Sequence, residues 1–181
     1  MKPLDYFPRN PVRNRTRIPE TGIFCAIVDA PFGALGIRTV ANRALREVVY
    51  LPPSTTLLAP QTKFAEKAAR QVGRYFNDCE FIFDLPLAPA GTVFQQKVWQ
   101  IIRAIPCGAV LTYSEVAKRL GTAPRAVGQA CGANWFPLVI PCHRVTATGG
   151  LGGFSNQADA NGFHIGVKRW LLAYEGLETY V

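Results

Sequence analysis

Residues 112–134 read TYSEVAKRLGTAPRAVGQACGAN, a pattern that indicates two short helices in succession. Thr112 and Glu115 have the spacing of a capping box, in which each side chain bonds to the other residue's backbone N–H. The pattern predicts a short helix whose apolar residues face inward, and Gly121 supplies a residue that ends it.

A second helix is expected to follow at once. Thr122 is the expected N-cap, Pro124 is tolerated in the first turn, and the helix is expected to continue to about Asn134. Two short helices joined by a tight turn form a helix-turn-helix, although an ordinary αα-hairpin has the same pattern. The second helix carries mostly small residues beside one long cation, Arg125, so its backbone can approach another surface closely.

The segment IPCHRV, residues 140–145, places a thiol next to an imidazole. A thiol becomes a useful nucleophile as thiolate, and the imidazole of His143 can accept the proton of Cys142 directly or through a water. Free cysteine is also among the most buried residue types, so the alternative is a structural Cys142.

With these motifs the chain resembles the O6-alkylguanine-DNA alkyltransferases, also called methylated-DNA–protein-cysteine methyltransferases. The resemblance covers residues 92–178 and is strongest in six ordered blocks, which are FQQKVW (94–99), IPCG (105–108), TY (112–113), RAVG (125–128), IPCHRV (140–145) and KRWLLAYEG (168–176). Asn134 and the segment GGFS (152–155) also match. The resemblance implies DNA repair by irreversible transfer of an alkyl group from O6-alkylguanine, and from O4-alkylthymine, to the protein's own cysteine in a single turnover.

The same resemblance implies roles for particular residues. Cys142 would be the nucleophile, His143 its base, and Glu175 the group that orients and stabilises the imidazolium. Tyr113 would donate a proton to the leaving guanine, since an unperturbed tyrosine is protonated at neutral pH. From the residues alone, Tyr113 could equally be a core aromatic and Glu175 a solvated acid near a helix C-terminus, where it is electrostatically unfavourable.

Further residues would bind DNA and hold the flipped base. Arg125 would fill the gap left by that base, and Ala126 would let its helix enter the minor groove. Asn134 would tie the turn to the cysteine-bearing segment, unless it is simply a helix C-cap. The expected DNA-binding residues are Thr112, Arg125, Ala126 and Gln129, and the expected pocket residues are Asn134, Pro137, Val145, Phe154 and Ser155. Residues 156–166 insert a polar loop beside this pocket, which is expected to act as a mobile lid.

Two other functions fit parts of the pattern. A cysteine hydrolase or acyltransferase could use Cys142 and His143, but the sequence shows no oxyanion-hole motif. A lesion-recognising DNA-binding protein of the alkyltransferase-like kind would lack the reactive cysteine. A transcriptional regulator is a further alternative, although no second cysteine-rich sensor segment is present.

The expected fold class is a two-domain α/β (α+β) chain. Residues 1–22 are a polar, basic tail, and residues 23–90 an α/β domain with its linker. The resemblance implies that residues 91–181 form a mainly helical, winged-helix-like domain, which contains the helix-turn-helix. Four strands are expected at residues 22–28, 34–40, 47–51 and 80–85, with one helix before the fourth strand and another beginning at the capping box of Thr92 and Gln95. The Pro-rich residues 85–91 are the expected linker.

Composition limits the function classes. The 181 residues are 49% hydrophobic and carry a net charge of +8, of which residues 91–181 contribute +4, so a polyanion such as double-stranded DNA is the expected partner. No apolar run is long enough for a membrane span or a signal peptide, which favours a cytoplasmic protein, or a nuclear one in a nucleated cell. A monomer is expected. Five cysteines without a C-x-x-C pair, and only two histidines, indicate reduced thiols, no metal and no cofactor.

Overall fold

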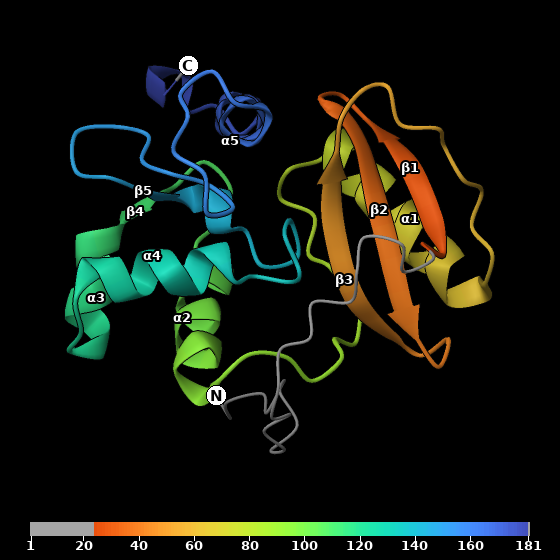
Figure 1. The fold of residues 1–181 in the computed structure, drawn as a ribbon, viewed down its shortest axis with the longest axis horizontal. Coiled ribbons are helices and arrows are strands. Elements are labelled where there is room, and N and C mark those ends of the chain that lie inside the picture. Colours follow the sequence, from red (N-terminus) through yellow and green to blue (C-terminus); the bar gives the residue numbers. More distant parts are fainter. Residues whose placement is uncertain (1–23, 181) are drawn as a thin grey trace.

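The computed structural model describes residues 24–180, which begin with a three-stranded antiparallel sheet (Figure 1). Its strands are β1 (Ala26–Ala30), β2 (Gly33–Val40) and β3 (Ala44–Leu51), paired in sequence order. At Gly33 φ is 142°, and an added Cβ would lie 2.5 Å from the carbonyl oxygen of Leu51, so the hairpin between β1 and β2 needs glycine here. The first three expected strands are present, and β1 extends to Ala30 instead of ending at residue 28.

One face of the sheet is covered by α1 (Lys63–Asn77). Thr62 caps this helix by accepting a hydrogen bond from the backbone N–H of Ala65 at 3.1 Å. Its buried residues recur at helical spacing and pack on the sheet; they are Ala65, Ala68, Gln71, Val72 and Tyr75.

The predicted strand at residues 80–85 is wrong. The side chain of Gln71 forms hydrogen bonds with both backbone groups of Asp84. It accepts from the N–H at 2.8 Å and donates to the carbonyl at 3.0 Å. These groups are therefore not available to a strand ladder. The chain instead pairs with the sheet slightly later, through an isolated parallel bridge between Leu45 and Leu87 inside the predicted linker.

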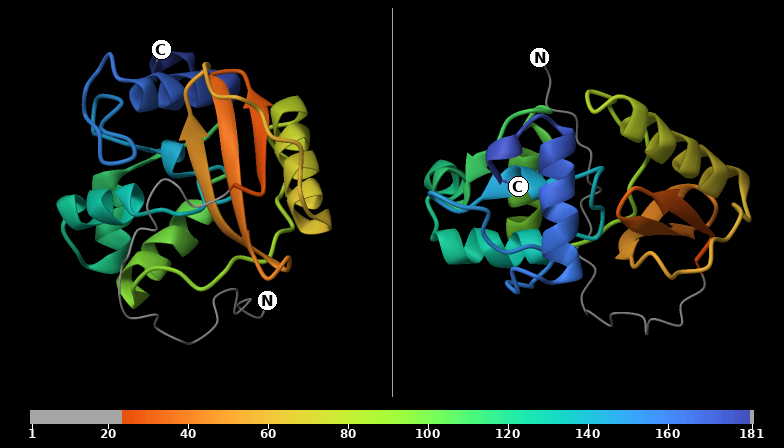
Figure 2. Two further views of the ribbon diagram at one scale, coloured as in Figure 1. Left: turned by 45° about the vertical axis from the view of Figure 1, so that its right-hand side comes forward. Right: turned by 90° about the horizontal axis from the view of Figure 1, so that it is seen from above.

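The second half of the molecule is helical. It contains α2 (Val93–Arg103), α3 (Tyr113–Leu120), α4 (Pro124–Gly132) and α5 (Phe163–Tyr174), with the short turns η1 (Cys142–Arg144) and η2 (Glu178–Tyr180). The strands β4 (Leu111–Thr112) and β5 (Val145–Thr146) form a parallel pair. Figure 2 shows the sheet and α1 on one side and these helices on the other. The mixed α/β fold class is confirmed, and no helix among residues 24–180 is long and apolar enough to cross a membrane.

Both predicted capping boxes are present, at the starts of α2 and α3. The predicted start of α4 is wrong, because Ala123 is its N-cap and makes no side-chain cap bond. Thr122 instead helps to end α3: its N–H donates to the carbonyl of Ala117 at 3.0 Å, while Gly121 adopts φ 61°. The helix also ends at Gly132, two residues before the predicted Asn134.

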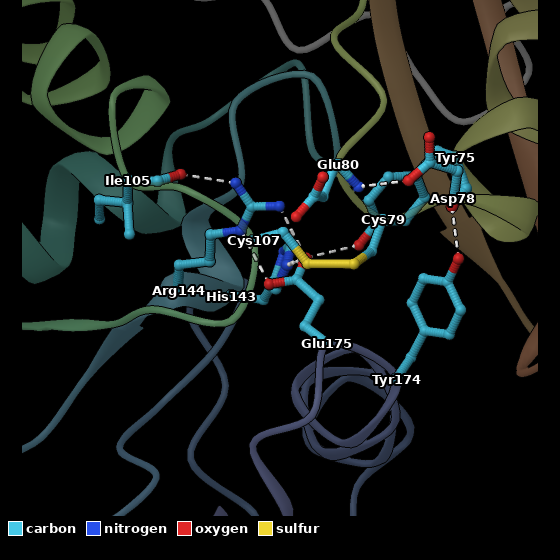
Figure 3. The surroundings of a disulfide bond; sticks show 10 residues. All are labelled: Tyr75, Asp78, Cys79, Glu80, Ile105, Cys107, His143, Arg144, Tyr174 and Glu175. Atoms are coloured by element: carbon cyan, nitrogen blue, oxygen red, sulfur yellow. Dashed lines mark hydrogen bonds and ion pairs between the residues drawn. A yellow bond between two sulfur atoms is a disulfide. The ribbon is translucent and has the colours of Figure 1, made fainter.

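A disulfide joins the two halves of the molecule and corrects the expectation of reduced thiols. Cys79, just after α1, is bonded to Cys107, in the turn after α2, and Figure 3 shows the surroundings of this bond. The two residues are 28 positions apart, and the packing of α1 near that turn brings their Cα atoms to 6.0 Å. Within the described part of the chain, Cys25, Cys131 and Cys142 are free thiols.

The loop that was expected over residues 156–166 is shorter than predicted. Gly162 is the N-cap of α5, so Phe163 and His164 belong to the first turn of that helix. Their rings contact each other, with centroids 5.3 Å apart. Residues 156–162 remain as the connecting loop.

Candidate active site

Cys142 opens the 3-10 turn η1 at the end of a buried segment. Residues 136–141 are all buried, and Cys142 itself is 5% exposed. Its backbone N–H donates to the carbonyl of Ile140 at 2.8 Å, and the N–H of Arg144 donates to that of Pro141 at 2.9 Å. The thiol is therefore held by a fixed backbone within the core.

Asn134 binds the cysteine segment at three points. Its Nδ2 donates to the carbonyl of Ile140 at 2.8 Å and to Cys142 Sγ at 3.2 Å, while its Oδ1 accepts from the N–H of Phe136 at 2.9 Å. Burial raises the pKa of Cys142, whereas the hydrogen bond from Asn134 and the nearby ammonium of Lys168 lower it. Asn134 thus lies where the resemblance implied, and it is not the C-cap, which is Ala133.

The side chains of His143 and Glu175 are fully buried and meet at 2.8 Å, through Nε2 and Oε1 (Figure 3). Arg144 donates to both carboxylate oxygens, from Nε at 2.9 Å and from Nη2 at 2.8 Å, and the Tyr75 hydroxyl donates to Oε1 at 2.8 Å. Glu175 is the C-cap of α5, where the helix dipole disfavours a negative charge. The hydrogen bonds from Arg144, His143 and Tyr75 compensate for this unfavourable position.

These contacts set the protonation of the pair. Burial would raise the pKa of Glu175, but hydrogen bonds and charge from His143 and Arg144 lower it to about 2. Burial lowers the pKa of His143, and the carboxylate of Glu175 opposes this effect only in part. A neutral imidazole facing an ionised carboxylate carries its proton on Nε2, so Nδ1, which has no partner among the described residues, is the basic nitrogen.

Tyr113 begins α3 and contacts the loop after β5. Its hydroxyl donates to the carbonyl of Gly153 at 2.9 Å, and burial raises its pKa, so it is protonated at neutral pH. Thr112, one residue earlier, accepts a hydrogen bond from the backbone N–H of Glu115 and caps the helix.

Lys168 is a site residue that sequence reasoning did not single out. It is 0% exposed, and its Nζ donates to the carbonyls of Val145 at 2.7 Å, Leu151 at 2.7 Å and Gly153 at 3.0 Å. Burial lowers its pKa to about 8. A lysine within the buried stripe of α5 was the signal that could have found it, because lysine is rarely buried without partners.

Of the expected pocket residues, Val145 and Phe154 contact this lysine. Pro137, Val145 and Phe154 are buried, and Ser155 has a left-handed backbone with φ 51°. The carbonyl of Val145 accepts a hydrogen bond from Lys168 at 2.7 Å.

Tyr50 on β3 is a second residue that sequence reasoning missed. Its ring centroid lies 5.6 Å from that of Phe154, and its buried hydroxyl has no partner within residues 24–180. Burial is the main cause that raises the pKa of Tyr50, and the negative charges of Cys142 and Glu175, when ionised, raise it further. No signal in the sequence connected a strand of the sheet with this site.

The predicted DNA-binding residues lie apart from the thiol. Arg125 and Gln129 are exposed on α4, and Ala126 is half-buried. A cavity of about 700 Å³ separates this helix from the sheet. It is lined by Ala126 and Gln129, by Arg46 and Trp135, and by other residues of both halves, but not by Cys142.

No group of three or more His, Cys, Asp or Glu side chains within the described residues could hold a metal ion. The donors gathered near Cys142 therefore bind each other, as described above. A buried cysteine, histidine and carboxylate thus lie in the same half of the molecule as the helix-turn-helix, an arrangement typical of the class of DNA-binding proteins that carry a reactive cysteine.

Comparisons with known proteins identify the family. Residues 93–177 match the family model described as the DNA-binding domain of 6-O-methylguanine DNA methyltransferase. The methylated-DNA–protein-cysteine methyltransferase of Methanosarcina acetivorans is 34% identical over 162 residues, covering 85% of this chain and 99% of the relative. The chain belongs to this family of methyltransferases.

Solved structures agree with this assignment. The O6-methylguanine methyltransferase of Mycobacterium tuberculosis superposes with a TM-score of 0.68 at 30% identity, covering 84% of this chain and 93% of that one. The same organism's protein in complex with DNA gives a TM-score of 0.66 at 33% identity, covering 83% of this chain and 91% of that one.

A further sequence relative, the methylated-DNA–protein-cysteine methyltransferase of Methanosarcina mazei, is 42% identical over 142 residues, covering 74% of this chain and 85% of the relative.

Proposed function

We propose that this protein repairs DNA by moving the alkyl group of O6-alkylguanine onto Cys142. The observation that carries the proposal is the buried Cys142 thiol, which accepts a hydrogen bond from Asn134 and precedes the hydrogen-bonded His143–Glu175 pair in the chain. The chain belongs to the methyltransferase family. The thioether formed is stable, so each molecule repairs one lesion. O4-alkylthymine presents the same bond to the nucleophile and is a second substrate.

The reaction is a substitution at carbon. His143 takes the thiol proton at Nδ1, directly or through a water, and Glu175 stabilises the imidazolium. The sulfur of Cys142 then bonds to the alkyl carbon while the carbon–O6 bond breaks and its electron pair stays on the guanine. Tyr113 donates a proton to that guanine. Tyr113 then regains a proton through solvent from His143, which carries the proton taken from Cys142. The products are S-alkylcysteine and an unmodified guanine.

DNA binding uses the exposed face of α4. Ala126 lets the helix enter the minor groove, Arg125 fills the place of the flipped nucleotide, and Thr112 and Gln129 contact the same duplex. The extrahelical base lies between Pro137, Val145 and Phe154, with the backbone N–H of Ser155 at its edge. The protein acts as a monomer in the compartment that holds the DNA, which is the cytoplasm of a cell without a nucleus.

Intact-protein mass after incubation with a duplex that contains one O6-methylguanine tests the transfer. We expect one added methyl per protein, located at Cys142 by peptide mapping, and no addition in Cys142→Ala. Cys142→Ala should still bind the duplex, because the thiol is not a phosphate contact. Methylation of another cysteine, or more than one repaired lesion per protein, would contradict the proposal.

Arg125→Ala separates base flipping from chemistry. We expect it to slow repair of the duplex far more than reaction with the free modified base, which needs no flipping. Equal losses on both substrates would show that Arg125 does not act in flipping. Turnover of a small thioester or ester by the wild-type protein would favour the cysteine hydrolase instead.

A further inference from the structure

The loop beside the base pocket is fastened to the end of α4 by one side chain. Asn156 Nδ2 donates to the carbonyl of Gly132, the last residue of the helix, at 2.8 Å. The last carbonyls of a helix have no partner within it, and they form the negative end of its dipole. An amide N–H₂ group is therefore a suitable partner for this helix end.

Gly132 is shaped for this contact. A Cβ added at Gly132 would lie 1.8 Å from Oδ1 and 2.4 Å from Cγ of Asn156. Both atoms belong to the side chain that makes the bond, so any larger residue at 132 would displace it. The glycine and the asparagine therefore form a complementary pair across 24 residues of sequence.

The backbone of the loop is held in an uncommon conformation at the same place. Ser155 and Asn156 both have positive φ, of 51° and 62°, between Phe154 and Gln157, which exchange two backbone hydrogen bonds of 2.8 Å. This is the φ pattern of a type I′ hairpin turn, which asparagine tolerates and serine does not favour. A left-handed serine costs free energy, so the neighbouring contacts must hold the turn in place.

Other side chains also hold this loop: Arg169 Nη1 donates to the carbonyl of Ala160 at 2.9 Å, and Lys168 Nζ donates to the carbonyl of Leu151 at 2.7 Å. Tyr113 and Lys168 both donate to the carbonyl of Gly153, at 2.9 and 3.0 Å. The bond from Asn156 is the attachment to α4, whose outer face is the proposed DNA surface. It links the helix that meets DNA to the segment that carries Phe154 and Ser155.

We propose that Asn156 is a specificity-determining, positioning residue, whose bond to Gly132 fixes the base-pocket loop against α4 and so limits the size of the alkyl group that Cys142 accepts. This inference rests on the proposed function. With the bond in place, the loop holds a small adduct close to the sulfur, which is the geometry that fast transfer requires. Without this bond the loop can move outward. The methyl group is then held less closely to the sulfur, so methyl transfer slows, while the pocket gains room for a bulkier group.

Two substitutions break the bond in different ways. Asn156→Gly keeps a residue that accepts positive φ and removes the donor, whereas Gly132→Ala leaves Asn156 intact and places a methyl group where its amide lies. Gln157→Ala is the control, because it truncates an exposed neighbouring side chain and keeps the backbone bonds of the turn.

The measurement is the second-order rate of transfer from one duplex sequence that carries either O6-methylguanine or O6-benzylguanine. We expect Asn156→Gly and Gly132→Ala each to raise the benzyl-to-methyl rate ratio about tenfold. Gln157→Ala should keep the wild-type ratio. A general loss of stability would slow both substrates together and leave the ratio unchanged.

The double variant tests whether the two residues act through one contact. In Asn156→Gly the space next to residue 132 is open, so adding Gly132→Ala should change the ratio little further. An unchanged ratio in both single variants, or fully additive effects in the double variant, would overturn the inference. Absence of methyl transfer by the wild-type protein would instead overturn the proposed function, which keeps the two failures apart.

Discussion

Cys142 lies between two groups of contacts that are built differently. The acid side consists of Tyr75, His143, Arg144 and Glu175, which bond to one another through side chains that are buried or nearly so. The loop side consists of Tyr113, Gly153, Asn156 and Lys168, where side chains bond to backbone carbonyls instead of to one another. The acid side joins both halves of the molecule, since Tyr75 comes from α1, whereas the loop side belongs to the second half alone.

The difference indicates a division of tasks. Buried charges that compensate one another fix the protonation of His143, and they are costly to disturb because each leaves a partner unpaired. Contacts to loop carbonyls fix a shape, and loss of the contact from Tyr113 or Asn156 lets that shape change without leaving a buried charge. The acid side should therefore govern reactivity and stability, and the loop side should govern which adduct fits.

The largest effect is expected from Glu175→Gln. The substitution keeps the size of the side chain but leaves the guanidinium of Arg144 buried without its carboxylate, which costs about 3–5 kcal/mol of unfolding free energy. Transfer should also slow strongly, because the imidazolium of His143 loses its counter-charge. Urea unfolding and the single-turnover rate measure the two effects.

Glu178→Gln is the matched control, since Glu178 is an exposed acid three residues further along the chain. It should leave both quantities close to wild type. If Glu175→Gln behaved like this control, the acid side would not be the stabilising element.

Removal of the disulfide should have the next largest effect. Cys79 and Cys107 brace the two halves beside the acid side, as Figure 3 shows, and they close a loop of 28 residues. Replacing both by serine should lower the free energy of unfolding by about 3–4 kcal/mol, through the entropy of the unfolded chain. Dithiothreitol should produce a similar loss in the wild-type protein and none in the serine variant, and insensitivity of the wild type would contradict this.

Low pH should remove the stability that the acid side contributes before it affects the loop side. The folded pKa of Glu175, about 2, lies below its ordinary value of 4.5, so its stabilisation is present above pH 4.5 and is lost as the pH falls toward 2. The full difference corresponds to about 3 kcal/mol. His143 acts in the same direction from about pH 6.5 downward, because its lowered pKa makes the folded state bind fewer protons than the unfolded state.

The pH prediction is tested by urea unfolding of wild type and Glu175→Gln between pH 7 and pH 3. The wild-type protein should lose more stability over this range than the variant does. Parallel curves for the two proteins would contradict the assignment of the effect to Glu175.

The smallest effect is expected from Lys168→Met on the loop side. Methionine fills a similar volume but leaves three carbonyls without their donor, while the cost of burying an ammonium disappears. These effects oppose each other, so we expect a net loss of about 1–3 kcal/mol. A loss as large as that of Glu175→Gln would remove the distinction between the two sides.

Most short-range signals were read correctly from the sequence, although the N-cap of α4 is Ala123 and not the predicted Thr122. The capping boxes of Thr92 and Thr112 and the ending of α3 at Gly121 involve residues a few positions apart, so their geometry follows from local backbone preferences. Cys142, His143 and Asn134 also lie within one short stretch. The sequence alone therefore determined the helix-turn-helix, the family and the thiol–imidazole pair.

Long-range contacts were decided only by the tertiary structure. Tyr75 and Glu175 are 100 residues apart, and the bond between Cys79 and Cys107 depends on how α1 packs near the turn after α2. Gln71 prevented the predicted fourth strand by bonding to the backbone of Asp84, which no local preference could indicate. Tyr50 and Lys168 reach the site because the sheet and α5 pack around it, and such packing depends on the whole core. The sequence determined that a cysteine and a histidine are neighbours at 142 and 143, and the fold determined which distant side chains surround them.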